Sequence, residues 1–240
     1  MMDPNTYKVL QYIMDHPKKD LHLNVTSNMC PADKKLKTKY FNMVRNICVE
    51  EKVEHVMQFV SVDGYGKRAE YIRHGLDFNY MMDNVEEFLD KIPARNSISF
   101  ICTYNNLSVT SMDKLLEKIL DLRKRYSKTY QRVWFDVPLL REPYWQMVNM
   151  LPESYQSIHE DNIEYMRKNA GEENGLHIFK DFEIQKMERN LAYWRKHYNP
   201  HYMHKRNFYA FFNEHDRRRL TRFLNVFPEM EEFWEECKNA

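Results

Sequence analysis

The sequence predicts an α/β fold over residues 1–142, followed by a helical extension over residues 143–240. The first observation behind this prediction is that short apolar segments alternate with segments of helical periodicity as far as Leu140. Such alternation is typical of parallel strands joined by right-handed crossovers. The second observation is that the strand pattern stops after Leu140, where Pro and Gly residues interrupt charged and aromatic segments. About four strands are predicted, too few to close an eight-stranded barrel, so they form either a small open sheet or part of a larger partial barrel.

Four segments have the composition of strands. In residues 21–28 the side chains of Leu21, Leu23 and Val25 alternate with polar ones, which is typical of a strand with one buried face. Residues 53–63 are rich in apolar side chains throughout, as expected of a strand buried on both faces. The other two predicted strands cover residues 97–103 and 132–140.

The predicted helices follow from their apolar spacing and from their ends. Residues 4–16 begin with Asp3 as the cap and Pro4 in the first turn, and His16-Pro17 ends this helix. After Asp63, a loop containing Gly64 and Gly66 is expected, followed by a short charged segment. The other predicted helices cover residues 33–49, 78–89, 112–126, 153–169, 181–197, 206–220 and 228–238.

Composition and charge favour a soluble protein of the cytoplasm. The net charge of +1 provides no overall field that would attract nucleic acid or an anionic membrane. No apolar run approaches the roughly 18 residues that a membrane span requires, so we expect no membrane partner. The first residues, Met1-Met2-Asp3-Pro4-Asn5, lack the charged and apolar regions of a signal peptide.

The cysteines and histidines do not form a recognisable metal-binding pattern. The four cysteines are Cys30, Cys48, Cys102 and Cys237, and no two are closer than 18 residues. Cluster and zinc sites usually bring thiolates together within a short loop, so we expect buried or incidental thiols. Cys30 is of most interest because it follows a predicted strand. His201 and His204 could share a helix face as metal ligands, but no further signature accompanies them, which favours a solvated or packed role.

Small polar residues follow each predicted strand. Ligands of parallel α/β sheets bind at the carboxyl ends of the strands, so these residues are candidates for a binding site. Each could instead form a turn for local reasons, but their presence at four strand ends in succession favours a polar ligand cleft. They are Thr26, Ser27 and Asn28, then Ser61, Asp63 and Gly64, then Thr103 and Asn105, and finally Asp136 and Pro138.

The most informative segment is SVDGYGKRAEYIR, from Ser61 to Arg73. Asp63, at a strand end, could hold a pair of sugar hydroxyls, and Arg73 could bind a carboxylate with its guanidinium fork. The alternative is a tight turn followed by a solvated face that contains Lys67, Arg68 and Glu70.

This segment, with others in the same order, resembles the radical S-adenosylmethionine (radical SAM) enzymes of the SPASM or twitch type. LHLNVTSN is similar to the third strand of that family, SISFICTYNNL to the fifth and VWFDVPLL to the sixth. The C-terminal NEHDRRRLTRFLNVFPEMEEFW is similar to the tail of twitch-type members. The resemblance covers nearly the whole chain and implies a partial radical SAM (β/α) barrel.

The resemblance also implies contacts with S-adenosylmethionine. In this family a Ser or Asp near the end of the fourth strand contacts the ribose or the amino group, a later Arg contacts the carboxylate, and the sixth strand flanks adenine with its backbone. The cofactor-binding residues expected on this basis are Asn28, Ser61, Asp63, Arg73, Thr103 and Val137. The expected substrate is a peptide or a small metabolite.

Two motifs of the family are missing from this chain. It has neither the C-x-x-x-C-x-x-C loop that binds the [4Fe–4S] cluster nor the G-G-E-P run that binds the amino group of the cofactor. We therefore expect the cluster in a complete family member, not ligated by this chain, and whether the chain alone is an enzyme stays open. Met2-Asp3-Pro4 resembles the residues after the second motif, so the chain is expected to begin there, through a split gene, a late start codon or degeneration. A chain that supplies the N-terminal half-barrel is the expected partner.

Two other functions are open. The first is that of a catalytically inactive radical SAM-like remnant that acts as a binding or scaffolding module. The second is RNA binding through a basic cluster near the C-terminus. Acidic residues beside that cluster, among them Glu214 and Asp216, favour ion pairs within the chain instead. The cluster consists of Arg217, Arg218, Arg219 and Arg222.

Overall fold

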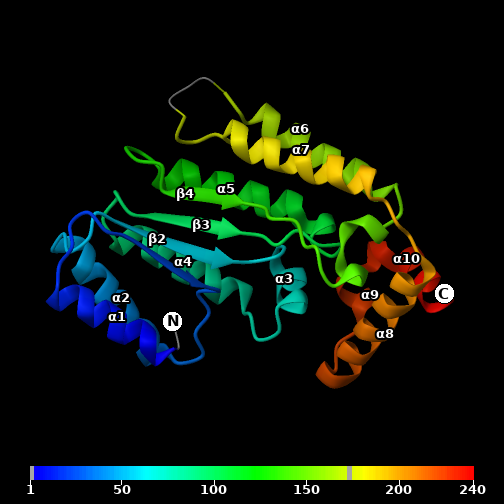
Figure 1. Cartoon of the computed structure of the whole chain (residues 1–240), viewed down its shortest axis with the longest axis horizontal. Coiled ribbons are helices and arrows are strands. Elements are labelled where there is room, and N and C mark those ends of the chain that lie inside the picture. The colour runs from blue at the N-terminus through cyan, green and yellow to red at the C-terminus, as the bar shows by residue number, and fades with distance from the viewer. Residues whose placement is uncertain (1–2, 172–174) are drawn as a thin grey trace.

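The computed structural model describes residues 3–171 and 175–240, and in these ranges it contains one sheet of four parallel strands (Figure 1). Each strand pairs in parallel with the next strand along the chain, so the order in the sheet is β1-β2-β3-β4. The predicted α/β fold, with about four parallel strands and a helical region after them, is confirmed. The strands are β1 (His22–Ser27), β2 (His55–Ser61), β3 (Ser97–Ile101) and β4 (Val133–Asp136).

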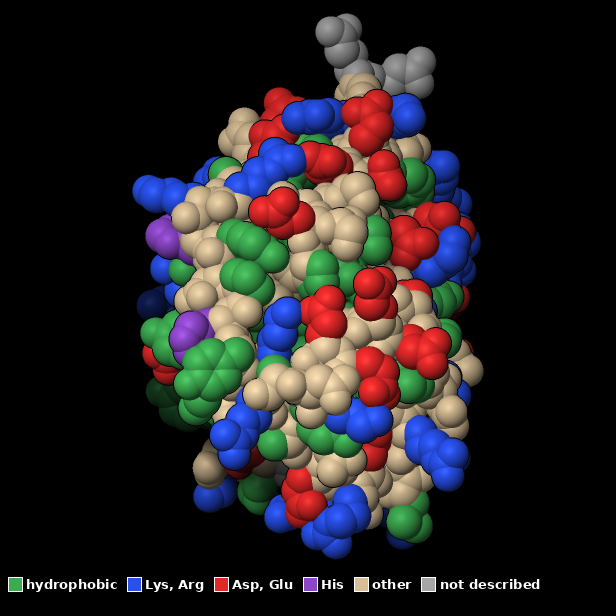
Figure 2. Space-filling view, turned by 90° about the vertical axis from the view of Figure 1, so that its right-hand side faces the viewer, with side chains coloured by type: hydrophobic (Ala, Val, Ile, Leu, Met, Phe, Trp, Pro, Cys, Tyr) green, Lys and Arg blue, Asp and Glu red, His purple; other side chains and the backbone are tan. Residues whose placement is uncertain are grey.

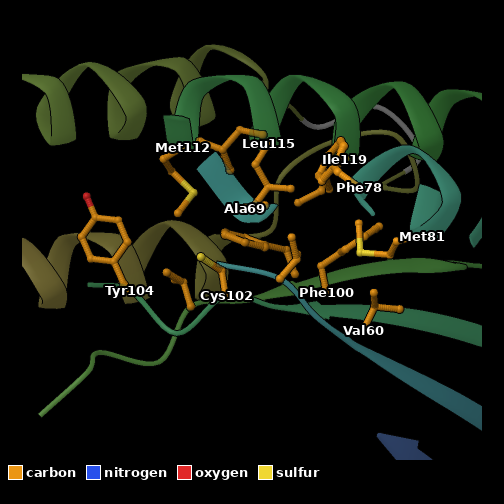
Figure 3. Packing of buried hydrophobic residues seen from close by; sticks show 14 of the residues in the cluster. Val60, Ala69, Phe78, Met81, Phe100, Cys102, Tyr104, Met112, Leu115 and Ile119 are labelled. Carbon is orange, nitrogen blue, oxygen red and sulfur yellow. The ribbon is translucent and has the colours of Figure 1, made fainter. Parts of the chain in front are cut away.

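The helices that connect the strands pack on one face of the sheet. Right-handed crossovers that all advance in one direction place every connecting helix on the same side, and in Figure 1 α4 and α5 lie behind the strands. Val60 and Phe100 are fully buried between the sheet and these helices, where Figure 3 shows them with Met81 and Ile119. The connecting helices are α2 (Lys34–Val49), α4 (Phe78–Lys91) and α5 (Met112–Tyr126).

The first helix, α1 (Pro4–Asp15), begins at the predicted cap and packs against α2. The Asp3 carboxylate accepts a hydrogen bond from the Asn5 N–H at 2.8 Å, which satisfies one of the unpaired donors of the first turn. The Tyr7 hydroxyl donates to the Leu36 carbonyl on α2 at 2.9 Å.

A short helix, α3 (Gly66–Ile72), occupies a segment for which the sequence predicted a loop and a short charged stretch. Three hydrogen bonds to distant segments hold it in place. The Tyr71 hydroxyl donates to the Asp216 carboxylate at 2.9 Å, and Arg68 donates to the carbonyls of Thr110 and Val226. These partners are 42 to 158 residues away along the chain, so the local pattern could not predict this helix.

Within the described residues, five α-helices follow the sheet. In Figure 1, α6 and α7 lie together beside β4, and α8, α9 and α10 lie beyond the carboxyl ends of the strands. The third helix starts at Tyr202 and not at residue 206 as predicted, because the His201 ring acts as its cap and accepts from the Met203 N–H at 3.2 Å. The helices are α6 (Tyr155–Lys168), α7 (Asp181–Lys196), α8 (Tyr202–Arg219), α9 (Phe223–Val226) and α10 (Glu231–Lys238). None of the helices in the described ranges is both long and apolar enough for a membrane span.

A fully buried ion pair joins α5, β4 and α7. The Arg123 guanidinium and the Glu183 carboxylate approach to 2.5 Å, and both side chains have no exposed surface. Other N–H groups of Arg123 and the carboxylate of Glu183 also form hydrogen bonds with the main chain. Arg123 donates to the carbonyls of Val133 and Ile178, and Glu183 accepts from the main-chain N–H of Phe135, on the outer edge of β4, at 3.1 Å. The edge of the sheet is thus closed by a side chain of α7 in place of a fifth strand.

A second buried contact joins the carboxyl end of β3 to α6 and α7. The Tyr104 hydroxyl lies 2.5 Å from His159 Nδ1, and His159 Nε2 lies 2.9 Å from the Met187 carbonyl. Because a carbonyl only accepts, Nε2 carries the proton and Nδ1 accepts from Tyr104. Burial lowers the pKa of His159 to about 4, so the ring is neutral at neutral pH.

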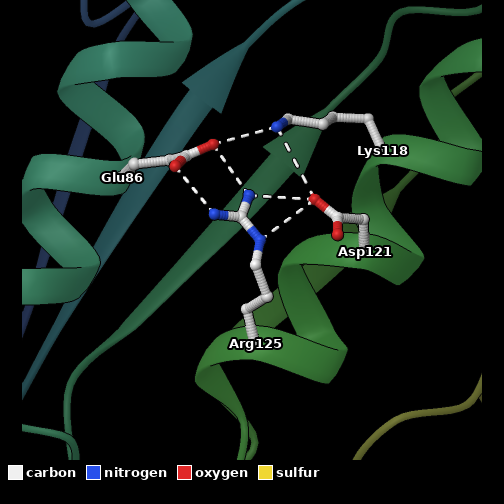
Figure 4. A network of polar contacts seen from close by, with 4 residues as sticks. All are labelled: Glu86, Lys118, Asp121 and Arg125. Carbon is white, nitrogen blue, oxygen red and sulfur yellow. Dashed lines mark hydrogen bonds and ion pairs between the residues drawn. The ribbon is translucent and has the colours of Figure 1, made fainter.

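A charged network at the surface joins α4 to α5 (Figure 4). Glu86 on α4 accepts from Arg125 and Lys118 on α5, and Asp121 pairs with the same two cations. The hydrogen bonds from Arg125 hold the pKa of Glu86 well below its usual range, at about 2. Because these side chains are a quarter to a half exposed, the network orients the two helices and adds little to stability.

Replacing Glu183 should strongly destabilise the protein. Glu183→Ala leaves the Arg123 guanidinium buried without its counter-charge, which we expect to lower the free energy of unfolding by about 3–5 kcal/mol. Urea unfolding followed by circular dichroism measures this change. The control is Glu188→Ala on the same helix, because Glu188 pairs with Arg167 at the surface and its loss should cost no more than about 1 kcal/mol. Losses of similar size in the two variants would contradict the structural role of the buried pair.

Stability should fall as the pH drops from about 6.5 to about 4. In this window an unfolded histidine takes up a proton, while the folded state, with the pKa of His159 near 4, does not. The unfolded state therefore binds more protons, and this one residue lowers the free energy of unfolding by up to about 3 kcal/mol at the acidic end. His159→Gln removes the titrating group, so urea midpoints across this window should show a shallower slope for the variant. An unchanged slope would show that other groups cause the loss.

Candidate functional site

The face of the sheet opposite α2, α4 and α5 carries mostly half-exposed side chains, and we call it the open face. Side chains along a strand alternate between the two faces. In β2 this alternation is clear, because Val56, Gln58 and Val60 are buried against the helices whereas Met57, Phe59 and Ser61 are partly exposed. The strand register aligns two rows across the open face. The first contains Thr26, Phe59, Ser99 and Trp134, and the second, nearer the carboxyl ends, contains Ser61, Ile101 and Asp136.

Four of the six predicted cofactor-binding residues lie at or just after the carboxyl ends of β1, β2 and β3. Ser27 is paired with Val60, so the next residue, Asn28, lies beside Ser61 at the end of the second row. Thr103 follows two residues after Ile101, and Asp63 lies in a bend just after β2, where its carboxylate accepts from the Thr103 N–H. The structure therefore brings together side chains from the ends of three neighbouring strands, as the strand-end rule led us to expect.

Asp63 and Arg73 bind each other. The carboxylate Oδ2 lies 2.6 Å from Arg73 Nε, and Oδ1 lies 3.1 Å from Nη2. Oδ1 also accepts from the Thr103 main-chain N–H at 2.9 Å, so the Asp63 side chain joins the ends of β2 and β3. Asp63 is nearly buried, whereas the Arg73 side chain is about one third exposed. In the described ranges no acceptor is found for Arg73 Nη1, so that end of the fork remains open to an anion.

At the fourth strand, the structure places Val137 differently from the prediction that its backbone contacts the cofactor. Val137 is buried, and its carbonyl accepts from Asn190 Nδ2 on α7 at 2.9 Å. The preceding residue, Asp136, points to the open face and forms an ion pair with Lys186 of α7. Sequence reasoning did not find Lys186, because 50 residues separate it from Asp136 and only the docking of α7 brings them together.

The four cysteines are free thiols, and three of them are buried. Cys30, the half-exposed one, lies after β1, and its Sγ accepts from the Asp77 N–H at 3.3 Å. Among the residues that the structure describes, no group of three or more His, Cys, Asp or Glu side chains is placed to hold a metal ion. Burial raises the pKa of Cys48 and of Cys237 to about 12, which makes both poor metal ligands at neutral pH.

The basic cluster near the C-terminus is neutralised in part within its own helix. Arg217 donates to Glu214 at 2.7 Å, and Arg218 donates to the same carboxylate at 2.6 Å, so the expected ion pairs are present. Figure 2 views the end of the molecule formed by the C-terminal helices, and there basic and acidic side chains are intermixed. This surface lacks the continuous positive field that phosphate backbones require.

We compared the chain with known protein families, curated proteins and solved structures. No family model matches the chain, and searches of the curated proteins and of the solved structures return no match. The α/β fold and the geometry of the open face therefore rest on this structure alone.

Proposed function

We propose that this chain binds the nucleoside and carboxylate parts of S-adenosylmethionine on its open face, as one part of an enzyme of the radical SAM type. The observation that carries the proposal is the convergence of Asn28, Ser61, Asp63 and Thr103 at the carboxyl ends of β1, β2 and β3, with Arg73 held beside them. Ligands of parallel α/β sheets bind outside the carboxyl ends of the strands, which is where these residues lie. The resemblance of the sequence to SPASM- and twitch-type members supplies the identity of that ligand.

Ser61, Asp63 and Arg73 have defined tasks in this proposal. The Ser61 hydroxyl both donates and accepts, which suits a ribose hydroxyl. Asp63 accepts a hydrogen bond from Nη2 of Arg73 and pairs with its guanidinium charge, which leaves Nη1 for the amino-acid carboxylate of the ligand. At β4 the carbonyls of Asp136, Val137 and Pro138 already accept from N–H groups of the chain, so we assign adenine no hydrogen bond to them.

The iron–sulfur cluster is not assigned to this chain. When bound, such a cluster supplies the electron that cleaves S-adenosylmethionine. The described residues provide no group of three or more His, Cys, Asp or Glu side chains that could hold a cluster. The task of this chain is therefore to bind and orient the cofactor next to a peptide or small-metabolite substrate.

The two edges of the sheet differ, and the β1 edge favours a second protein chain as the partner. The β4 edge is closed by Glu183 and Asn190 of α7. At the other edge, β1 pairs with β2 alone among the strands of the described ranges. Its segment HLNVTS contains neither Pro nor Lys, the residues that commonly protect an edge from further pairing. A parallel strand of the chain that carries the N-terminal half-barrel fits this edge.

The alternative is a module that uses the open face for binding or scaffolding without radical chemistry. Its support is the same lack of cluster ligands among the described residues. RNA binding is less well supported, because Glu214 already pairs with two of the arginines in the basic cluster. The two main functions differ in one measurable property, which is affinity for S-adenosylmethionine.

S-adenosylmethionine should bind to the purified chain in isothermal titration calorimetry. Ser61→Ala removes the proposed ribose contact and should weaken binding by about three- to tenfold, the value of one net hydrogen bond. The control is Ser157→Ala, which removes an exposed hydroxyl on α6 that donates only to the Ser154 carbonyl and should leave the affinity unchanged. S-adenosylhomocysteine, which retains the nucleoside and the carboxylate, should bind as well.

A folded chain that shows no saturable heat with either compound would refute the nucleoside-binding role and favour the scaffold. Equal weakening by Ser61→Ala and Ser157→Ala would place the ligand away from the open face.

A further inference from the structure

A groove with a volume of about 690 Å³ runs between the first two helices, α1 and α2, which lie side by side in Figure 1. Its floor is apolar, because Tyr7 is nearly buried and Leu36 and Met43 are half-buried there. The groove continues on α2 into a hollow of about 600 Å³, which shares Met43 with it and follows the helix from Lys34 to Asn46. At 1.5 Å per residue this length is about 18 Å, or roughly three turns of a helix.

Four exposed lysines line the groove and the hollow. In the part of the chain that the structure describes, none of the four pairs with a carboxylate, whereas Lys37 of the same helix pairs with Glu87 at 2.7 Å. Asp15 also lines the groove and accepts from Gln11 at 3.0 Å. The groove therefore carries an excess of positive charge, although the net charge of the whole chain is only +1. The four lysines are Lys8, Lys34, Lys35 and Lys39.

The two rims of the groove present both apolar and charged surface to solvent. On the α1 rim, 64% of Tyr12 is exposed even though its ring stacks on His16. On the α2 rim, Lys39 Nζ lies 5.0 Å from the centroid of the Tyr7 ring, so the lysine stem covers the floor while its residue stays exposed. A partner can therefore contact these groups without any rearrangement of the two helices.

We infer that this groove binds an acidic amphipathic helix of a partner protein, about three turns long. The apolar stripe of that helix packs on Leu36, Met43 and Tyr12, as in other complexes in which a helix fills a hydrophobic groove. Its carboxylates pair with the ammonium groups of the lysines along the groove. Charge complementarity selects this occupant, because a basic helix would place like charges together. A flat membrane surface fits less well, since the apolar floor lies between two helices.

This inference goes beyond the proposed function and does not depend on it. Helix α2 packs on the face of the sheet opposite the open face, so the groove is remote from the strand ends assigned to S-adenosylmethionine. A partner helix and the cofactor can therefore be bound at the same time.

Fluorescence anisotropy with the intact chain and three stapled helical peptides of about 14 residues tests the inference. The first peptide carries Leu at positions i, i+3, i+4 and i+7 and Glu on both sides of that stripe. The second has Lys in place of Glu, and the third has Ser in place of Leu. The staple keeps all three helical. The Leu/Glu peptide should bind saturably, and the other two should bind at least about tenfold more weakly.

Reversing two charges of the α2 rim should reverse the preference between the acidic and the basic peptide. Lys35→Glu combined with Lys39→Glu should weaken binding of the Leu/Glu peptide by about tenfold and strengthen binding of the Lys peptide. The matched control is Lys124→Glu combined with Lys128→Glu, which changes the net charge equally. Both control lysines are exposed, form no ion pair in the described ranges and do not line the groove.

Tyr12→Ala removes apolar surface from the α1 rim and should weaken binding of the Leu/Glu peptide by about threefold or more. Its control is Tyr130→Ala, because Tyr130 is exposed to a similar extent (53% against 64% for Tyr12) and lies outside the groove. All the substituted side chains are exposed, so the variants should fold, which circular dichroism verifies.

A lack of saturable binding of the Leu/Glu peptide would overturn the inference, as would equal binding of the Glu and Lys peptides or equal effects of the two double variants. Self-association in sedimentation velocity that Lys35→Glu with Lys39→Glu abolishes, without peptide binding, would assign the groove to a second copy of the chain instead. Binding to phosphatidylserine vesicles without peptide binding would assign it to a membrane, and either result would overturn the partner helix. None of these measurements involves S-adenosylmethionine, so their failure leaves the proposed function untouched.

Discussion

The buried Arg123–Glu183 pair is the interaction on which the arrangement of this molecule depends. Neither side chain has exposed surface, so each charge requires the other together with further hydrogen bonds. The pair obtains them from the main chain of β4 and from the segment before α7. Helix α7 therefore has one position along the edge of the sheet. From that position it covers the β4 edge and places Lys186 beside Asp136.

The second constraint is the parallel, consecutive order of the strands. It places the connecting helices on one face and collects the strand ends at one edge, so polar residues distant in the sequence become neighbours. Asp63 then links the ends of β2 and β3 and holds Arg73 beside them. A polar surface at the carboxyl ends of β1, β2 and β3 results.

Much of this structure could be predicted from local sequence patterns. The four strands and most of the helices were predicted, and the shared position of Asn28, Ser61, Asp63 and Thr103 followed from the strand-end rule. Helix α3 was not predicted, because Tyr71 and Arg68 find their partners in the C-terminal region. The predicted strand 132–140 proved longer than β4, which ends at Asp136 and is followed by a single bridge between Tyr104 and Leu139. The boundary between residues 142 and 143 remains a prediction.

The sequence by itself determined the fold class and the chemical character of the strand ends, because both depend on periodicity and on residues close together along the chain. Only the tertiary structure decided what those residues bind. It paired Arg73 with Asp63, and it brought Lys186 to Asp136 across 50 residues. It also formed the groove that α1 and α2 line together. The physical reason is that burial, charge pairing and grooves between helices arise only when distant segments pack together, and no local pattern encodes that packing.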